Sequence, residues 1–106
     1  MKKLTINEEI FLIAIWHLKE EAYGVKIHAK IEELSGSKIL YGTLYNTLDY
    51  LVRKRYVKTR KGEPSEKRGG SNKVYYRITL TGKKALQNAR ELQNTLWKDI
   101  PKFAFK

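Results

Sequence analysis

The chain has 106 residues, of which 42% are hydrophobic and none is cysteine. This length suits a single domain, and a domain this small buries so little of its surface that oligomerisation is expected. The absence of cysteine excludes disulfides and thiolate metal sites and fits a reducing cytoplasm. Its apolar runs are far shorter than the roughly 18 residues of a membrane span, so we expect a soluble, cytoplasmic protein.

Positive charge is concentrated in the later part of the chain, which has a formal net charge of +11. Residues 1–36 carry 5 basic and 6 acidic residues, whereas residues 37–106 carry 17 basic and 5 acidic ones. Residues 53–77 alone hold 10 basic and 2 acidic residues. A surface that is merely solvated usually mixes its signs, so this segregation favours a polyanionic partner, either nucleic acid or an anionic membrane.

The first half of the chain has the apolar periodicity of three helices. Thr5 and Glu8 match the capping-box pattern ahead of an apolar run, which predicts a first helix of about four turns. A second helix is expected over 25–34, ended by Gly36 in the left-handed conformation. A third is expected over 41–55. The predicted core face of this third helix consists of Leu44, Leu48, Leu51 and Val52.

After the third predicted helix the apolar pattern changes from helical to alternating. Val57 and Thr59 alternate with basic residues, and the same alternation continues over 74–78, which predicts two strands. The intervening segment, 62–72, is rich in glycine and charge and is expected to form a hairpin loop. The sequence therefore predicts a basic β-hairpin.

A last helix is predicted over 80–97, with Thr79 as its N-cap. Its apolar residues recur at intervals of four, three and four, the spacing of a coiled-coil seam that would pair two subunits. The predicted dimer interface consists of Ala85, Ala89, Leu92 and Leu96. Trp97 follows this seam, and we interpret it as a core residue, with a position lining a ligand as the alternative.

The order of three helices, strand, basic loop, strand and helix is that of a winged helix-turn-helix, in which the third helix enters the DNA major groove. The expected fold class is α+β and mainly α. Residues 1–79 would form the DNA-binding domain, and residues 80–106 the dimerisation helix and tail.

Four segments resemble the PadR-type transcriptional regulators: YGVKIHAKI, GTLYNTLDYL, YVKTR and GGSNKVYYRITLTGKKAL. Together they cover roughly residues 22–86. The resemblance implies a dimeric repressor whose last helix pairs two subunits, and some small members of the family bind flat aromatic compounds at that interface. Many members carry a longer C-terminal helical region, so we expect a minimal member of the family.

The polar face of the third predicted helix is interpreted as a DNA-reading surface. Gly42 lies where the helix N-terminus would approach a phosphate, and Asn46 suits the edge of an adenine. Arg53 suits a phosphate or a flanking guanine. A solvated polar face without a ligand is the alternative. The DNA-binding residues predicted on this helix are Tyr41, Gly42, Thr43, Asn46, Thr47, Tyr50, Arg53 and Lys54. Tyr45, at the edge of the apolar arc, is expected to pack in the core with its hydroxyl near the backbone.

The predicted tip of the wing supplies a second set of DNA-binding residues, namely Lys67, Arg68, Gly69 and Gly70. The cations would neutralise phosphates or enter a narrow minor groove, and the glycines would let the loop follow the groove closely. A plain hairpin loop is the alternative. The same residues lack the spacing of a nucleotide-binding P-loop.

Catalysis and metal binding receive little support. His17 and His28 have no evident carboxylate partner, and two histidines without cysteine make a poor zinc site. We expect no enzyme activity, no metal and no cofactor.

The sequence thus predicts a homodimeric, sequence-specific transcriptional regulator, a repressor, that binds double-stranded DNA at an inverted-repeat operator. By resemblance, a planar aromatic effector is a further partner. One alternative is a non-specific architectural nucleic-acid binder. Another alternative is a protein that binds anionic membranes. The lack of a basic helix with a large apolar face argues against it.

Overall fold

The computed structural model describes residues 3–62 and 73–105. Its elements are α1 (Ile6–Leu18), the short 3-10 helix η1 (Lys19–Glu21), α2 (Gly24–Ser35), α3 (Tyr41–Arg53), β1 (Val57–Lys61), β2 (Val74–Ile78) and α4 (Leu80–Trp97). β1 and β2 form a two-stranded antiparallel sheet. The predicted fold class, a mainly helical winged helix-turn-helix, is confirmed. Within the described ranges no helix is long and apolar enough to cross a membrane.

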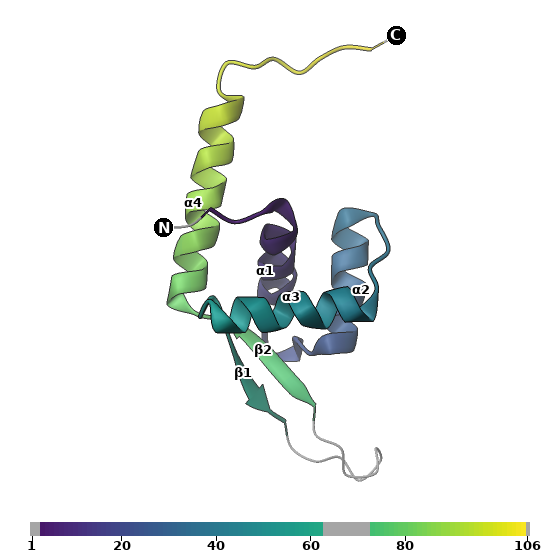
Figure 1. Ribbon diagram of the computed structural model, residues 1–106. Coiled ribbons are helices and arrows are strands. Elements are labelled where there is room, and N and C mark those ends of the chain that lie inside the picture. The colour runs from purple at the N-terminus through teal and green to yellow at the C-terminus, as the bar shows by residue number, and fades with distance from the viewer. Residues whose placement is uncertain (1–2, 63–72, 106) are drawn as a thin grey trace.

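The helices α1, α2 and α3 pack together, and α4 extends away from them (Figure 1). α3 crosses in front of α1 in this view, and the two strands lead downward from its C-terminal end. α4 rises from the base of the sheet, so its last turns stand clear of the three-helix core. The fold therefore presents the wing and the end of α4 on opposite sides of the core.

The helix boundaries follow from local capping. The Thr5 hydroxyl accepts the Glu8 N–H at 3.1 Å, and the Glu8 carboxylate accepts the Thr5 N–H at 2.8 Å, which confirms the predicted capping box of α1. Gly36 ends α2 with φ of 71°, as predicted. The Thr79 hydroxyl accepts the Gly82 N–H at 3.0 Å and caps α4.

The core lies where α3 crosses α1 and α2. The predicted apolar face of α3 is confirmed, because Leu44, Leu48 and Leu51 are completely buried. Leu12 from α1 and Ile27 from α2 are buried against the same cluster. Burial contributes about 1.5–3 kcal/mol for each such side chain, so this cluster holds α3 firmly in place.

The start of α4 is fixed to the junction between α3 and β1. The Thr79 hydroxyl donates to the Arg55 carbonyl at 2.6 Å, and the Thr79 N–H donates to the Tyr56 carbonyl at 3.0 Å. Gly82 lies so close to the Tyr56 backbone that an added Cβ would overlap the Tyr56 carbonyl oxygen. Any larger residue would therefore push α4 away from this junction.

The strand register assigns each side chain of the sheet to one of two faces. Val57 lies opposite Ile78, and Thr59 lies opposite Tyr76; on this face Val57, Tyr76 and Ile78 are buried in the core, and Thr59 is exposed. Two further pairs, Lys58 with Arg77 and Arg60 with Tyr75, have the opposite orientation because side chains alternate along a strand. Tyr23 adds an isolated antiparallel bridge to Tyr75 at the outer edge of β2.

Candidate nucleic-acid interface

The turn between α2 and α3 is held by two side chains of α2. His28 Nε2 donates to the Ile39 carbonyl at 2.6 Å, and the Glu32 carboxylate accepts the Ile39 N–H at 3.0 Å. His28 Nε2 also lies 3.7 Å from a carboxylate oxygen of Glu32. The expectation that His28 has no carboxylate partner is therefore wrong, and the i,i+4 spacing of His28 and Glu32 on a helix is the signal that could have revealed the pair.

The outward face of α3 carries most of the residues predicted to read DNA. Asn46 and Arg53 are exposed on the side opposite the buried leucines, and Thr43 is exposed at the edge of this surface. Tyr50 is half-buried beside them, with the Lys54 ammonium 5.7 Å from its ring centroid. These side chains form one continuous polar surface along the helix.

The N-terminus of α3 is open. No side chain caps it, since Leu40 occupies the N-cap position. A Cβ built on Gly42 would meet nothing within 4 Å, so the surface beside the first turn is unobstructed. The unsatisfied N–H groups of a helix N-terminus and its dipole attract anions, and here a phosphate has room to approach the backbone.

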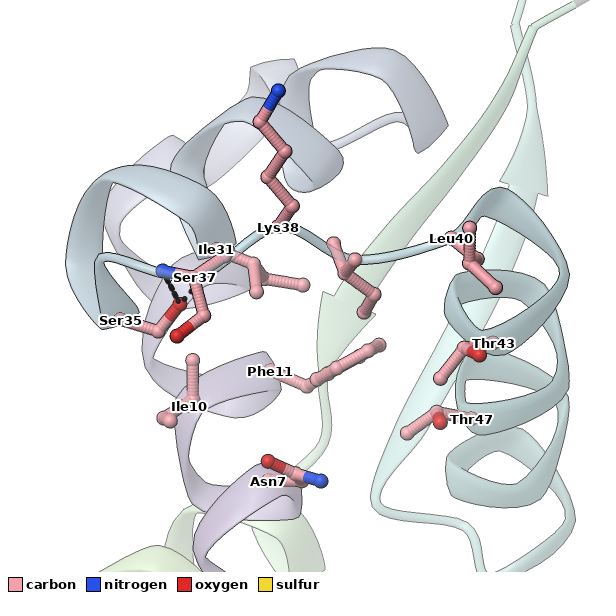
Figure 2. A pocket seen from close by; sticks show the side chains of 11 residues that line it. Asn7, Ile10, Phe11, Ile31, Ser35, Ser37, Lys38, Leu40, Thr43 and Thr47 are labelled. Carbon is pink, nitrogen blue, oxygen red and sulfur yellow. Dashed lines mark hydrogen bonds between the residues drawn. The ribbon is translucent and has the colours of Figure 1, made fainter.

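A hollow of about 480 Å³ is enclosed by the N-terminal half of α1, the end of α2, the turn between α2 and α3, and the first turns of α3. Thr43 and Thr47 point into it from α3, facing Asn7 and Phe11 of α1 (Figure 2). The Lys38 side chain leaves its rim and runs away from the two threonines. Thr47 is half-buried, so it lies at the flank of the exposed polar surface of α3 rather than at its centre.

Two tyrosines line the other flank of α3. Tyr41 stacks on His28 and lies 6.4 Å from the ring of Tyr45. Tyr45 is 42% exposed, so the prediction that its ring packs in the core is wrong. Its hydroxyl does lie against the backbone, because a Cβ added at Gly24 would overlap it. The ring end packs on α2 at Gly24, where the missing side chain leaves room for it.

Tyr76 of β2 is buried in the core cluster that also contains the leucines of α3. Burial raises the pKa of the Tyr76 phenol above its ordinary value, and the nearby Asp49 carboxylate and Tyr45 add to this shift.

The wing residues Lys67, Arg68, Gly69 and Gly70 lie outside the described residues. Elsewhere, a hydrogen bond and the charge of Lys30 lower the pKa of Glu33, whose carboxylate is 2.8 Å from the Lys30 ammonium.

The residues predicted for a dimer interface divide into two groups. Ala85 is 3% exposed and packs in the core of its own chain, so the prediction that it meets a second subunit is corrected. Ala89 is half-buried, and Leu92 and Leu96 are exposed, Leu96 to 59%. Trp97 is 60% exposed, so our interpretation of it as a core residue is wrong.

No metal-binding cluster accompanies these surfaces, since the described residues contain no group of three His, Cys, Asp or Glu side chains placed to hold an ion. Three features of this chain are typical of the DNA-binding domain of a winged-helix transcriptional regulator. They are a helix whose leucines are buried and whose polar face is exposed, the open N-terminus of that helix, and a pair of antiparallel strands. The sequence model of the transcriptional regulator PadR-like family matches residues 13–88, and the chain belongs to this family of non-enzymatic regulators.

Solved structures support the same assignment. A transcriptional regulator from Clostridium thermocellum is 27% identical, with a TM-score of 0.72 over 93% of this chain and 90% of that one. RosR of H. salinarum is 25% identical, with a TM-score of 0.70 over 94% and 83% of the two chains. A PadR family transcription regulator from Clostridium difficile is 25% identical, with a TM-score of 0.67 over 86% and 91%. No curated protein matches the sequence.

Proposed function

We propose that this PadR-like regulator is a cytoplasmic repressor that binds an inverted-repeat operator as a homodimer and reads it with α3. The observation that carries this proposal is the exposed polar face of α3 beside an uncapped, unobstructed helix N-terminus. Such a face allows a helix to enter the major groove with its first turn against the backbone.

Within this face the residues have different roles. Asn46 is exposed in the second turn of α3, where an amide can bond an adenine edge at two points. Gly42 and Arg53 suit phosphate contacts, which position the protein without reading sequence. The predicted wing residues Lys67 and Arg68 would add backbone contacts. The proposed DNA-binding unit is residues 1–79.

Residues 80–106 are proposed to pair two subunits. Leu92, Leu96 and Trp97 leave apolar surface exposed on the last turns of α4, where a second copy of the helix would cover it.

The resemblance to small family members that bind flat aromatic compounds makes Trp97 the proposed contact for such an effector. Titrating a panel of planar aromatic compounds while following tryptophan fluorescence tests this, with Trp97→Phe separating its signal from that of Trp16.

Sequence-specific binding is tested by selecting bound duplexes from a random DNA pool. Asn46→Ala is then compared with wild type on the selected operator and on a scrambled duplex at one salt concentration. We expect a loss of about 1–3 kcal/mol on the operator and little change on the scrambled duplex. Asn94→Ala, which removes an exposed amide from α4, is the matched control.

The alternative of a non-specific architectural DNA binder makes a different prediction. Such a protein would show a small ratio of specific to random affinity, and the random pool would yield no preferred sequence. Equal weakening of both duplexes by Asn46→Ala would assign α3 to backbone binding alone.

A further inference from the structure

The wing has a second surface, which we call the rear face and define as Lys58, Arg60, Tyr75 and Arg77. These four side chains share one side of the sheet because Lys58 pairs with Arg77 and Arg60 pairs with Tyr75. The connection between α1 and α2 borders this side through Lys19 and Glu20, and together they enclose a hollow of about 330 Å³. Four cations and one carboxylate therefore surround a single concave surface.

The rear face points away from α3. The intervening pair on the sheet, Thr59 with Tyr76, has the opposite orientation, and Tyr76 is buried in the same core cluster as the leucines of α3. Side chains on neighbouring positions of a strand project from opposite sides, so Lys58 and Arg77 project from the far side of the sheet. A straight duplex read by α3 therefore does not reach the rear face of the same subunit.

The charges on the rear face are not balanced within the described residues. Glu20 is 3.6 Å from Arg60, and no other carboxylate there pairs with a cation of this face. Lys58 and Arg77 lie directly opposite each other, and like charges at opposed positions of an antiparallel pair are unfavourable. A carboxylate at either position would form an ion pair, so this arrangement favours an external anion.

Aromatic rings hold two of the neighbouring cations in place. The Arg60 guanidinium lies 4.3 Å from the ring centroid of Tyr75, and the Lys73 ammonium lies 4.0 Å from that of Tyr23. The two rings meet edge to face at 5.6 Å. Cations fixed over rings lose little side-chain freedom when an anion binds, so the surface is prepared for one.

We propose that the rear face binds the phosphate backbone of a second DNA segment, different from the duplex that α3 reads. This inference rests on the proposed function, because it requires a protein that already holds an operator. The side chains lining the hollow are suited to phosphates: lysine and arginine predominate, and no asparagine or glutamine is present to read a base edge. The regulator would thereby bring two DNA segments together.

The test uses the full chain on a bead-bound operator duplex and measures capture of a second, labelled duplex of scrambled sequence. Wild type is expected to capture it. Lys58→Gln/Arg77→Gln is expected to capture it about tenfold less and to lower the salt dependence of capture by about one to two units of slope. Binding to the short operator should stay within about twofold of wild type, since neither residue lies on the α3 side.

Lys98→Gln/Lys102→Gln removes the same charge from the tail and is expected to capture the second duplex like wild type. Thermal unfolding checks the fold, and the double variant should be at least as stable as wild type because it removes a like-charge pair. Three results would overturn the proposal: no capture by wild type, undiminished capture by the double variant, or an equal loss of operator binding and capture. A failure of the proposed function appears one step earlier, as the absence of any preferred operator.

Discussion

The imidazole of His28 lies flat against the ring of Tyr41, with centroids 4.1 Å apart and ring planes 7° from parallel. The same imidazole donates to the Ile39 carbonyl, so one side chain of α2 fixes both the turn and the first residue of α3. The donation requires a proton on Nε2, which defines the tautomer of the neutral ring. The angle at which α3 leaves the turn therefore depends on a residue that does not face the DNA side.

His28→Ala is predicted to lower the free energy of unfolding by about 1–3 kcal/mol, the sum of a hydrogen bond and an aromatic pair. Thermal denaturation measures it, with a fall of about 4–8 °C for each kcal/mol in a domain of this size. His17→Ala is the control, because His17 is exposed and its ring packs edge to face with Trp16. Equal effects of the two substitutions would contradict a structural role for the stack.

Gly42→Ala is predicted to separate folding from DNA binding. The new methyl group meets nothing in the free protein, and alanine favours a helix, so stability should be unchanged or higher by up to about 1 kcal/mol. Operator affinity should nevertheless fall about tenfold, or about 1.4 kcal/mol, because the methyl group occupies the space left for a phosphate. Gly82→Ala provides the contrast, since its methyl group would overlap the Tyr56 carbonyl and destabilise the fold. Unchanged operator affinity would mean that DNA does not approach Gly42.

Leu92→Lys combined with Leu96→Lys is predicted to convert dimers into monomers. Each leucine buried in the proposed interface should contribute about 1.5–3 kcal/mol, and the added charges would repel across it. Analytical ultracentrifugation measures the change. Gln87→Lys/Asn94→Lys adds the same charge one heptad apart on the opposite side of α4 and should leave the dimer intact. A persistent dimer in the leucine variant would place the interface elsewhere.

The double variant Lys67→Ala/Arg68→Ala is predicted to weaken operator and scrambled DNA alike. Both side chains are expected to neutralise phosphates, which carry no sequence information. The slope of log affinity against log salt should become shallower by about one to two units per subunit. Asn46→Ala is the internal comparison, because it should change specificity and leave this slope nearly constant. A wing variant that loses only operator binding would show that the wing reads bases.

Raising the pH is predicted to destabilise the protein through Tyr76. The pKa of its phenol is higher in the folded protein than in the unfolded chain. The neutral buried phenol therefore contributes its full stabilisation at any pH below the pKa of the unfolded chain. It is lost as the pH rises through the higher folded value, where the buried phenol ionises. Denaturant midpoints from about pH 8 to about pH 11 measure this loss. Tyr76→Phe should remove part of the pH dependence, whereas Tyr41→Phe, at an exposed ring, should not.

Much of the fold is predictable from the sequence because it depends on local signals. The capping box at Thr5, the left-handed Gly36 and the N-cap at Thr79 each act within one turn, and each occurs where the sequence predicts it. The periodicity of α3 likewise identifies its buried face, since Leu44 and Leu48 repeat every turn. Local chemistry and tertiary packing agree at these positions.

The errors occur where distant segments decide the outcome. Ala85 has the spacing of a coiled-coil seam, yet the core of its own chain covers it. Tyr45 is exposed and packs its hydroxyl against Gly24 of α2, a contact that no local pattern reveals. The rear face of the wing depends on strand register, and register can be read only once both strands are paired.

The contacts of Thr79 and Gly82 make the base of α4 an extension of the α3–β1 junction. A pivot of α4 would therefore also move the C-terminal end of α3. In a dimer joined through α4, the crossing angle of the two helices would set the distance between the two copies of α3. Half-sites one helical turn apart need that distance to be about 34–36 Å. A small molecule that alters the crossing angle near Trp97 would then change the distance between the two copies of α3. The two helices would no longer match the half-site spacing, although the small molecule contacts neither of them.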